Sequence, residues 1–241
     1  MLDGSAQKDR QRPPSAVGEQ MRRDWDERAR VNALYYIVTD AAESDEQFEA
    51  SGEQSVGHIL ADIQHLLPTP TTVLEIGCGI GRMLRPLARR FASVYGVDVS
   101  GEMIDRARER LADLGNVNVW LTDGGTLEPV ESSTVDLVIS YLVFQHIPDA
   151  SIAEANIRDT FRVLKEGGLF KFQVAGHEDT EEAEFAERER TKDTWTGVSF
   201  SDSAIRRVVE RAGFTVRSTY SHKPPDSCIF LWVIAEKPRS R

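Results

Sequence analysis

Cysteine is scarce in this chain, which contains only Cys78 and Cys228 among its 241 residues. Two cysteines are too few for a disulfide scaffold, and this low number is typical of a reducing compartment. No run of residues approaches the roughly 20 consecutive apolar positions that a membrane-spanning helix needs. Residues 1–17 also lack the apolar segment of a secretory signal. The sequence therefore predicts a cytoplasmic protein without membrane association.

Positive charge is in deficit. The chain has 29 Lys and Arg residues and 39 Asp and Glu residues, which gives a net charge of −10. A field of that sign repels nucleic-acid phosphates, so we expect no nucleic-acid partner. Hydrophobic residues make up 40% of the chain and charged residues 28%. This balance excludes global disorder and, at this length, favours one larger α/β domain with added segments.

The chain divides into three parts. Residues 1–17 are polar and proline-containing, which predicts a disordered tail. Residues 18–68 predict two helices, because apolar and aromatic side chains recur there at helical spacing. Residues 69–241 hold the core and, at about residues 178–200, an insertion between two of its elements.

Short apolar runs alternate with amphipathic helices after residue 70, a pattern typical of parallel sheets built from βαβ units. The five predicted strands are Thr72–Ile76, Ser93–Val97, Val117–Leu121, Val135–Ser140 and Leu169–Ala175. The helix predicted after the first strand runs from about Ile80 to Phe91. Two further runs, Thr215–Tyr220 and Ile229–Ile234, flank a proline-containing turn and predict a hairpin.

A glycine-rich turn follows the first predicted strand. Gly77, Gly79 and Gly81 permit positive φ and let the backbone approach a ligand closely. The next strand ends in Asp98, where a carboxylate can accept the hydroxyls of a ribose. The spacing G-x-G-x-G disfavours a dinucleotide site, which is typically G-x-G-x-x-G, and therefore disfavours an NAD-dependent oxidoreductase.

The stretch VLEIGCGIGR, with Glu75 before the loop, resembles motif I of the class I S-adenosylmethionine-dependent methyltransferases. The resemblance extends from about Thr72 to Val174 through VYGVDVSGEMI, LTDGG, VDLVISYLVFQHIPD and RVLKEGGLFKFQV, in the order of the family. It implies a Rossmann-like, doubly wound, mostly parallel sheet of seven strands with an antiparallel last strand. It also implies an N-terminal helical lid and S-adenosylmethionine as the cofactor.

The same resemblance implies the cofactor contacts. The glycine loop lies against the methionine and ribose moieties, Asp98 accepts the ribose hydroxyls, and Met103 packs near the adenine. For Asp123 an alternative role in a turn stays open. The residues expected at the cofactor are Glu75, Gly77, Cys78, Gly79, Gly81, Arg82, Asp98, Val99, Met103, Asp123, Gly124, Ser140 and Tyr141.

Two histidines are candidates for the general base that a hydroxyl acceptor needs. His146 follows the fourth predicted strand and His177 follows the fifth, so both lie at the edge where open α/β sheets bind ligands. His177 is the better placed of the two, whereas His146 suits a role beside the cofactor equally well. The run His177–Asp179 has metal-ligand chemistry, but neighbouring side chains seldom converge on one ion, and no metal site is predicted.

The acceptor is expected between segments outside the core, namely the N-terminal helices and the insertion at 178–200, which are substrate lids in this family. Tyr35, Tyr36 and Trp195 are the candidate acceptor contacts, because aromatic rings stack on sugar rings and planar molecules. Trp25 is interpreted instead as packing its helix on the sheet.

The sequence thus predicts a methyltransferase that acts on a hydroxyl of a small polar acceptor, such as a sugar or glycoside, as a monomer or homodimer. Two alternatives stay open: methylation of a small amine, and a non-catalytic partner protein with the same fold.

Overall fold

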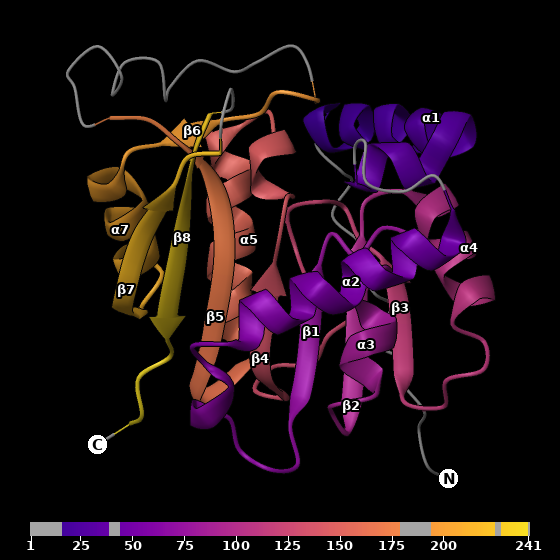
Figure 1. Cartoon of the computed structure of the whole chain (residues 1–241). Coiled ribbons are helices and arrows are strands. Elements are labelled where there is room, and N and C mark those ends of the chain that lie inside the picture. Colours follow the sequence, from indigo (N-terminus) through magenta and orange to yellow (C-terminus); the bar gives the residue numbers. More distant parts are fainter. Residues whose placement is uncertain (1–15, 39–43, 179–193, 225–227, 241) are drawn as a thin grey trace, which may run out of the picture.

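The computed structural model describes residues 16–38, 44–178, 194–224 and 228–240. Its centre is an eight-stranded sheet of order β3-β2-β1-β4-β5-β8-β7, with β6 paired to β5 (Figure 1). The strands are β1 Thr72–Ile76, β2 Ser93–Asp98, β3 Val117–Leu121, β4 Val135–Ser140, β5 Leu164–Gly176, β6 Ser199–Phe200, β7 Thr215–His222 and β8 Ile229–Glu236. Strand β8 runs antiparallel to both of its neighbours, β5 and β7, while β1 to β6 pair in parallel.

Helices cover both faces of this sheet. The helices are α1 Ala16–Val38, α2 Asp45–Leu60, α3 Leu84–Ala88, α4 Gly101–Arg110, α5 Ala150–Val163 and α7 Asp202–Arg211, with short 3-10 turns η1 Gln64–Leu66 and η2 Phe144–His146. Apolar residues of α2, α3 and α4 form one buried layer on the sheet, and those of α5 and α7 form the other. The doubly wound α/β fold predicted from the sequence is confirmed.

Helix α1 lies across the carboxyl ends of the parallel strands (Figure 1). Its Arg22 donates to the backbone oxygen of Thr122 just after β3. Its Asp26 accepts hydrogen bonds from the Ser100 hydroxyl, at 2.6 Å, and from the backbone N–H of Glu102. The helical geometry is interrupted at Asn32, which has φ −167° and ψ 90°.

The predicted elements differ from the observed ones at several places. Helix α3 begins only at Leu84, because the positive φ of 87° at Gly81 is incompatible with a helix over the preceding turn. Strand β5 starts five residues earlier than predicted, where Gly167 and Gly168 exchange backbone hydrogen bonds with Lys237. Strand β6 was not predicted, since two residues carry no readable alternation.

The N-terminal boundary also needs correction. Most of the tail predicted for residues 1–17 lies outside the described residues, but α1 already begins at Ala16 and buries Val17. Of the predicted insertion, residues 179–193 lie outside the described part.

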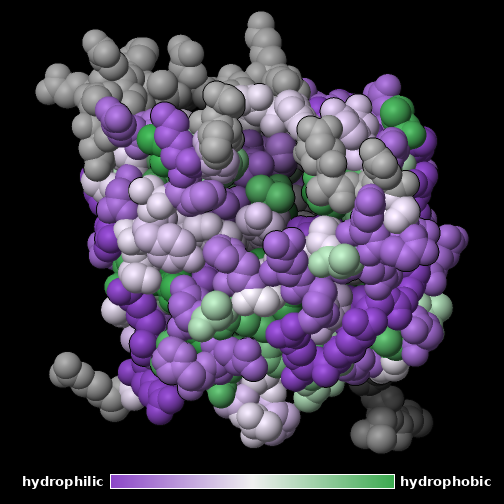
Figure 2. All heavy atoms as spheres, in the orientation of Figure 1, coloured by the Kyte–Doolittle hydropathy of each residue, from purple (hydrophilic) through white to green (hydrophobic). Residues whose placement is uncertain are grey.

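The surface on the α2 side is largely hydrophilic, with hydrophobic residues in small separate areas (Figure 2). Among the described residues, no helix combines the length and apolar character required to span a bilayer.

Candidate functional site

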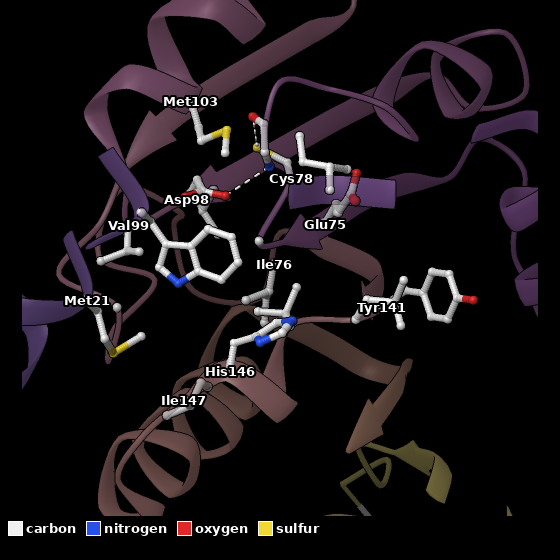
Figure 3. Close-up of a pocket in the computed structure, with 18 of the residues that line it drawn as sticks. Met21, Glu75, Ile76, Cys78, Asp98, Val99, Met103, Tyr141, His146 and Ile147 are labelled. Carbon is white, nitrogen blue, oxygen red and sulfur yellow. Dashed lines mark hydrogen bonds between the residues drawn. The ribbon is translucent and has the colours of Figure 1, made fainter. Parts of the chain in front are cut away.

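A cavity of about 310 Å³ opens at the carboxyl ends of β1, β2 and β4, beneath α1. Side chains from the strand ends, α1 and the segment after β4 converge on it (Figure 3). Glu75 and Tyr141 lie on one side, Asp98 and Met103 on the other, and His146 between them. The lining residues are Met21, Trp25, Tyr36, Ile37, Glu75, Ile76, Gly77, Cys78, Gly79, Arg82, Val97, Asp98, Val99, Met103, Thr122, Gly124, Tyr141, Leu142, Val143, Gln145, His146, Ile147, Asn156, Trp195 and Phe230.

The glycine loop forms one wall of this cavity. Gly77 has φ +73°, and a Cβ atom there would lie 2.3 Å from a methyl carbon of Val143. Gly79 has φ +53°, and its Cβ would lie 2.9 Å from Cδ1 of Ile37 on α1. The positive φ therefore favours glycine at both positions, and at Gly77 the close approach of Val143 leaves no space for a side chain either.

Asp98, at the end of β2, holds this loop in place. Its Oδ2 accepts a hydrogen bond from the backbone N–H of Gly79 at 2.9 Å (Figure 3). Its Oδ1 accepts one from the N–H of Ser100, also at 2.9 Å. Burial raises the pKa of the Asp98 carboxyl, and these backbone hydrogen bonds oppose that shift. A carboxylate has about four acceptor positions, so each oxygen can still accept a hydroxyl.

Glu75 and Arg82 place an acidic and a basic side chain on the cavity wall. Glu75 is 3% exposed, and burial raises its pKa to about 8, although the Arg82 charge opposes that rise. Arg82 donates to the backbone oxygen of Ser51 and the hydroxyl of Ser55, both on α2. Glu75 Oε2 and Arg82 Nε are buried without hydrogen-bond partners among the described residues. Such orphaned atoms at a cavity are typical of a site that binds a polar ligand.

Three of the thirteen expected cofactor residues lie outside the lining. Gly81 packs against Leu111, and the Ser140 hydroxyl donates to the backbone oxygen of Ile76. Asp123 accepts hydrogen bonds from the N–H groups of Gly125 and Thr126, which is the alternative turn role. The other ten line the cavity, and of these Cys78 is a buried thiol whose pKa burial raises.

The two candidate bases lie in different surroundings. His146 lines the cavity, and its Nδ1 lies 2.5 Å from the backbone oxygen of Trp195. His177 lies outside the lining, with its Nδ1 2.9 Å from the hydroxyl of Ser199 on β6. The geometry at the cavity therefore favours His146 as the base.

His177–Asp179 was the run with metal-ligand chemistry. Among the described residues, no three or more His, Cys, Asp or Glu side chains lie close enough together to hold a metal ion. Asp179 lies outside the described residues.

Aromatic rings gather at the end of the cavity under α1. The His146 ring lies 5.3 Å from the Trp25 ring and 5.0 Å from the Trp195 ring, and Tyr36 lies 5.6 Å from Trp195, between ring centroids. Tyr35 is 45% exposed, lies outside the lining and makes an edge contact with Tyr36. Of the three expected acceptor contacts, the structure brings together Tyr36 and Trp195.

Several residues line the cavity although the sequence did not predict them there. Trp25, interpreted as a packing residue, lines the cavity. Gln145 and Phe230 also line it, and Gln145 Oε1 is buried without a hydrogen-bond partner among the described residues. Gln145 could have been predicted at the cavity because it directly precedes His146 in the sequence. No local pattern indicated Phe230, because its position depends on the pairing of β8 with β5.

Comparison with known proteins points to one kind of domain. A model described as a methyltransferase domain matches residues 73–168. An uncharacterized methyltransferase of Geobacillus sp. (strain WCH70) is 26% identical over an alignment of 212 residues that covers 82% of this chain and 94% of that protein. The trans-aconitate 2-methyltransferase of Afipia carboxidovorans is 30% identical over an alignment of 145 residues that covers 58% of this chain but only 51% of that enzyme.

A solved structure covers nearly the whole chain. It is the geranyl diphosphate C-methyltransferase from Streptomyces coelicolor A3(2), in complex with Mg²⁺, geranyl diphosphate and S-adenosyl-L-homocysteine. It matches with a TM-score of 0.64 at 15% identity and covers 94% of this chain and 99% of that one. At this level of identity the match shows a shared fold.

Proposed function

Because the chain belongs to the class I S-adenosylmethionine-dependent methyltransferases, we propose that it methylates a hydroxyl oxygen of a small polar acceptor, such as a sugar or glycoside. S-Adenosylmethionine is the methyl donor, and S-adenosylhomocysteine is the product that leaves.

The lining fits this cofactor. Asp98 has acceptor positions for ribose hydroxyls beside the narrow glycine loop. Glu75 Oε2 and Arg82 Nε are the orphaned buried atoms that suit an ammonium and a carboxylate, the two charged groups of a methionine moiety. Met103 and Val99 supply apolar surface for the adenine on the Asp98 side (Figure 3). When bound, the cofactor supplies an electrophilic methyl group on a sulfonium sulfur.

The observation that carries the proposal is the contact between His146 Nδ1 and the backbone oxygen of Trp195, at 2.5 Å. A carbonyl oxygen only accepts hydrogen bonds, so this contact requires a proton on Nδ1. The neutral ring then has its lone pair on Nε2, which suits a general base. Gln145 Nε2, 3.4 Å from His146 Nε2, is a donor consistent with the same tautomer.

His146 Nε2 takes the hydroxyl proton while the acceptor oxygen forms its bond to the methyl carbon and the bond from that carbon to sulfur breaks. Such base assistance contributes roughly 100-fold or more to the rate. A neutral amine acceptor has its own lone pair and needs this base less, which is why an oxygen acceptor is favoured.

The character of the acceptor follows from the charges in the cavity. Among the described lining residues, the Asp, Glu, Lys and Arg side chains are Glu75, Arg82 and Asp98, all on or near the glycine loop. The end under α1 is lined instead by aromatic rings and by Gln145. These groups suit an uncharged ring that carries hydroxyls, because aromatic faces stack on it and Gln145 Oε1 accepts a hydrogen bond from it.

Calorimetric titration with S-adenosylhomocysteine, with NAD as the control ligand, comes first. Binding of S-adenosylhomocysteine alone is expected, and the absence of binding would favour a non-catalytic partner protein. Screening of sugars, phenols and amines with S-adenosylmethionine then tests the acceptor, and methylation of amines alone would overturn the hydroxyl proposal.

The base is tested by two matched variants. His146→Gln is expected to lower the turnover of the methylated hydroxyl roughly 100-fold or more while S-adenosylhomocysteine still binds. His177→Gln is expected to keep its turnover, because that ring lies at β6 outside the lining. Loss of turnover only in His177→Gln would transfer the base role to His177.

A further inference from the structure

The group that orients His146 is a backbone carbonyl, and it belongs to a segment far away in the sequence. Trp195 precedes β6, while His146 ends η2 directly after β4. A carbonyl oxygen keeps its position only if the chain on both sides of it is held. What holds residue 195 therefore decides the orientation of the His146 ring.

The chain after Trp195 is held by the backbone around His146 itself. The N–H of Gly197 donates to the oxygen of Gln145 at 2.6 Å, and that of Val198 donates to the oxygen of Ile147 at 2.8 Å. A Cβ atom on Gly197 would lie 2.4 Å from the Ile147 oxygen, so this approach requires glycine. These contacts fix one side of residue 195.

The chain before Trp195 is held by α1. The Thr194 hydroxyl is fully buried, accepts a hydrogen bond from Arg28 Nη1 at 2.7 Å, and donates one to Asp24 Oδ2 at 2.8 Å. The Arg28 guanidinium also lies over two indoles, 4.8 Å from the Trp25 ring centroid and 5.5 Å from that of Trp195. Cation–π contacts of this kind stabilise the positions of both indole rings.

We propose that Thr194 and Arg28 are positioning residues, which set the tautomer and orientation of the base His146 through the Trp195 carbonyl. This inference rests on the proposed function, because it takes His146 as the base. It also makes α1 a part of the catalytic apparatus, although neither Thr194 nor Arg28 lines the cavity.

The tautomer of His146 can be observed without knowledge of the acceptor. Two-bond ¹H–¹⁵N spectra of ¹⁵N-labelled protein, recorded above the pH range in which histidine titrates, distinguish a proton on Nδ1 from one on Nε2. His146→Gln identifies the His146 signals among those of the five histidines. The wild type is expected to show the Nδ1–H pattern.

Thr194→Val keeps the shape of the side chain but removes the hydroxyl, and Arg28→Met removes the guanidinium. Both are expected to lose the Nδ1–H pattern at His146, while Thr194→Ser retains it. Arg30→Met is the matched control on the same helix, because Arg30 pairs with Glu102 on α4. S-Adenosylhomocysteine affinity is expected to stay unchanged in all four variants.

The outcomes separate the two proposals. A wild type with the Nε2–H pattern would overturn the base role of His146. A wild type with the Nδ1–H pattern that persists in both Thr194→Val and Arg28→Met would overturn the positioning role and leave the base role intact. If Thr194→Val does not fold, Arg28→Met decides by the same spectrum.

Discussion

Asp98 carries two tasks at the scale of a single residue. It fixes Gly79 through a backbone hydrogen bond, and under the proposed function its remaining acceptor positions bind the ribose of the cofactor. Asp123 is another acid that was expected at the cofactor. Its Oδ1 instead accepts hydrogen bonds from the backbone N–H groups of Gly125 and Thr126 in a turn. Both carboxylates follow a predicted strand, so the sequence does not distinguish their roles. Their hydrogen bonds in the structure do.

Asp98→Ala is expected to weaken S-adenosylhomocysteine binding by at least about tenfold, because hydrogen bonds to a charged group contribute roughly 1.5–3 kcal/mol. Asp123→Ala is the control and is expected to alter the affinity much less, since Asp123 lies outside the lining. Calorimetric titration of both variants measures this difference. Equal affinities in the wild type and Asp98→Ala would remove the ribose assignment.

Helix α1 is the element on which both ends of the cavity depend. Met21 lies on the cofactor side (Figure 3), while Trp25 and Tyr36 face the aromatic end. Its polar contacts with the sheet side include those of Asp26, which accepts hydrogen bonds from Ser100 and Glu102 at the start of α4. Because α1 contributes lining residues on both sides, we expect it to move when a ligand enters and to be held closed once the ligand is bound.

Bound S-adenosylhomocysteine is therefore expected to slow amide hydrogen exchange in peptides from α1, because the ligand favours the closed state. Peptides from α7 serve as the internal control, since α7 contributes no residue to the lining. Asp26→Ala is expected to reduce the protection of α1 and to weaken binding by roughly 2- to 10-fold, the range for one hydrogen bond of about 0.5–1.5 kcal/mol. Equal slowing in α1 and α7 would contradict the role of α1 as a cover.

At the scale of the whole molecule, the core was predictable and the lid contacts were not. Strands β1 to β4 have almost the predicted bounds, because short buried strands appear as continuous apolar runs. The Thr194–Asp24 hydrogen bond joins residues 170 positions apart, and no local pattern encodes it. The same holds for Phe230, whose position depends on sheet pairing. Local spacing thus predicted the glycine loop, and the sequence also named Tyr36 and Trp195, but the contacts that bring these two rings together depend on the folded chain.

The buried Glu75 is expected to make the stability of the whole protein depend on pH. Its pKa is about 8 in the folded state, above the ordinary value near 4.5, so the folded state retains a proton that the unfolded chain releases. The stabilising contribution is complete below about pH 4.5 and declines as the pH rises to about 8. Glu75→Gln keeps a neutral group, so its free energy of unfolding is expected to fall less steeply over this interval.

Urea unfolding of both proteins across that pH interval measures the effect. Glu109→Gln on the exposed side of α4 makes the same change of charge and serves as the control. Parallel pH profiles of the wild type and Glu75→Gln would show that Glu75 is ionised in the folded protein.

The two ends of the cavity are built from different elements of the chain, so they can change independently during evolution. The donor end is built from strand termini and the glycine loop, where Gly77 and Gly79 have a positive φ that favours glycine. The acceptor end is built from α1, the segment after β4 that holds Gln145 and His146, and the residues before β6. Under the proposed function, substitutions at Trp25 or Tyr36 are therefore expected to alter the choice of acceptor while the glycine loop at the donor end stays unchanged.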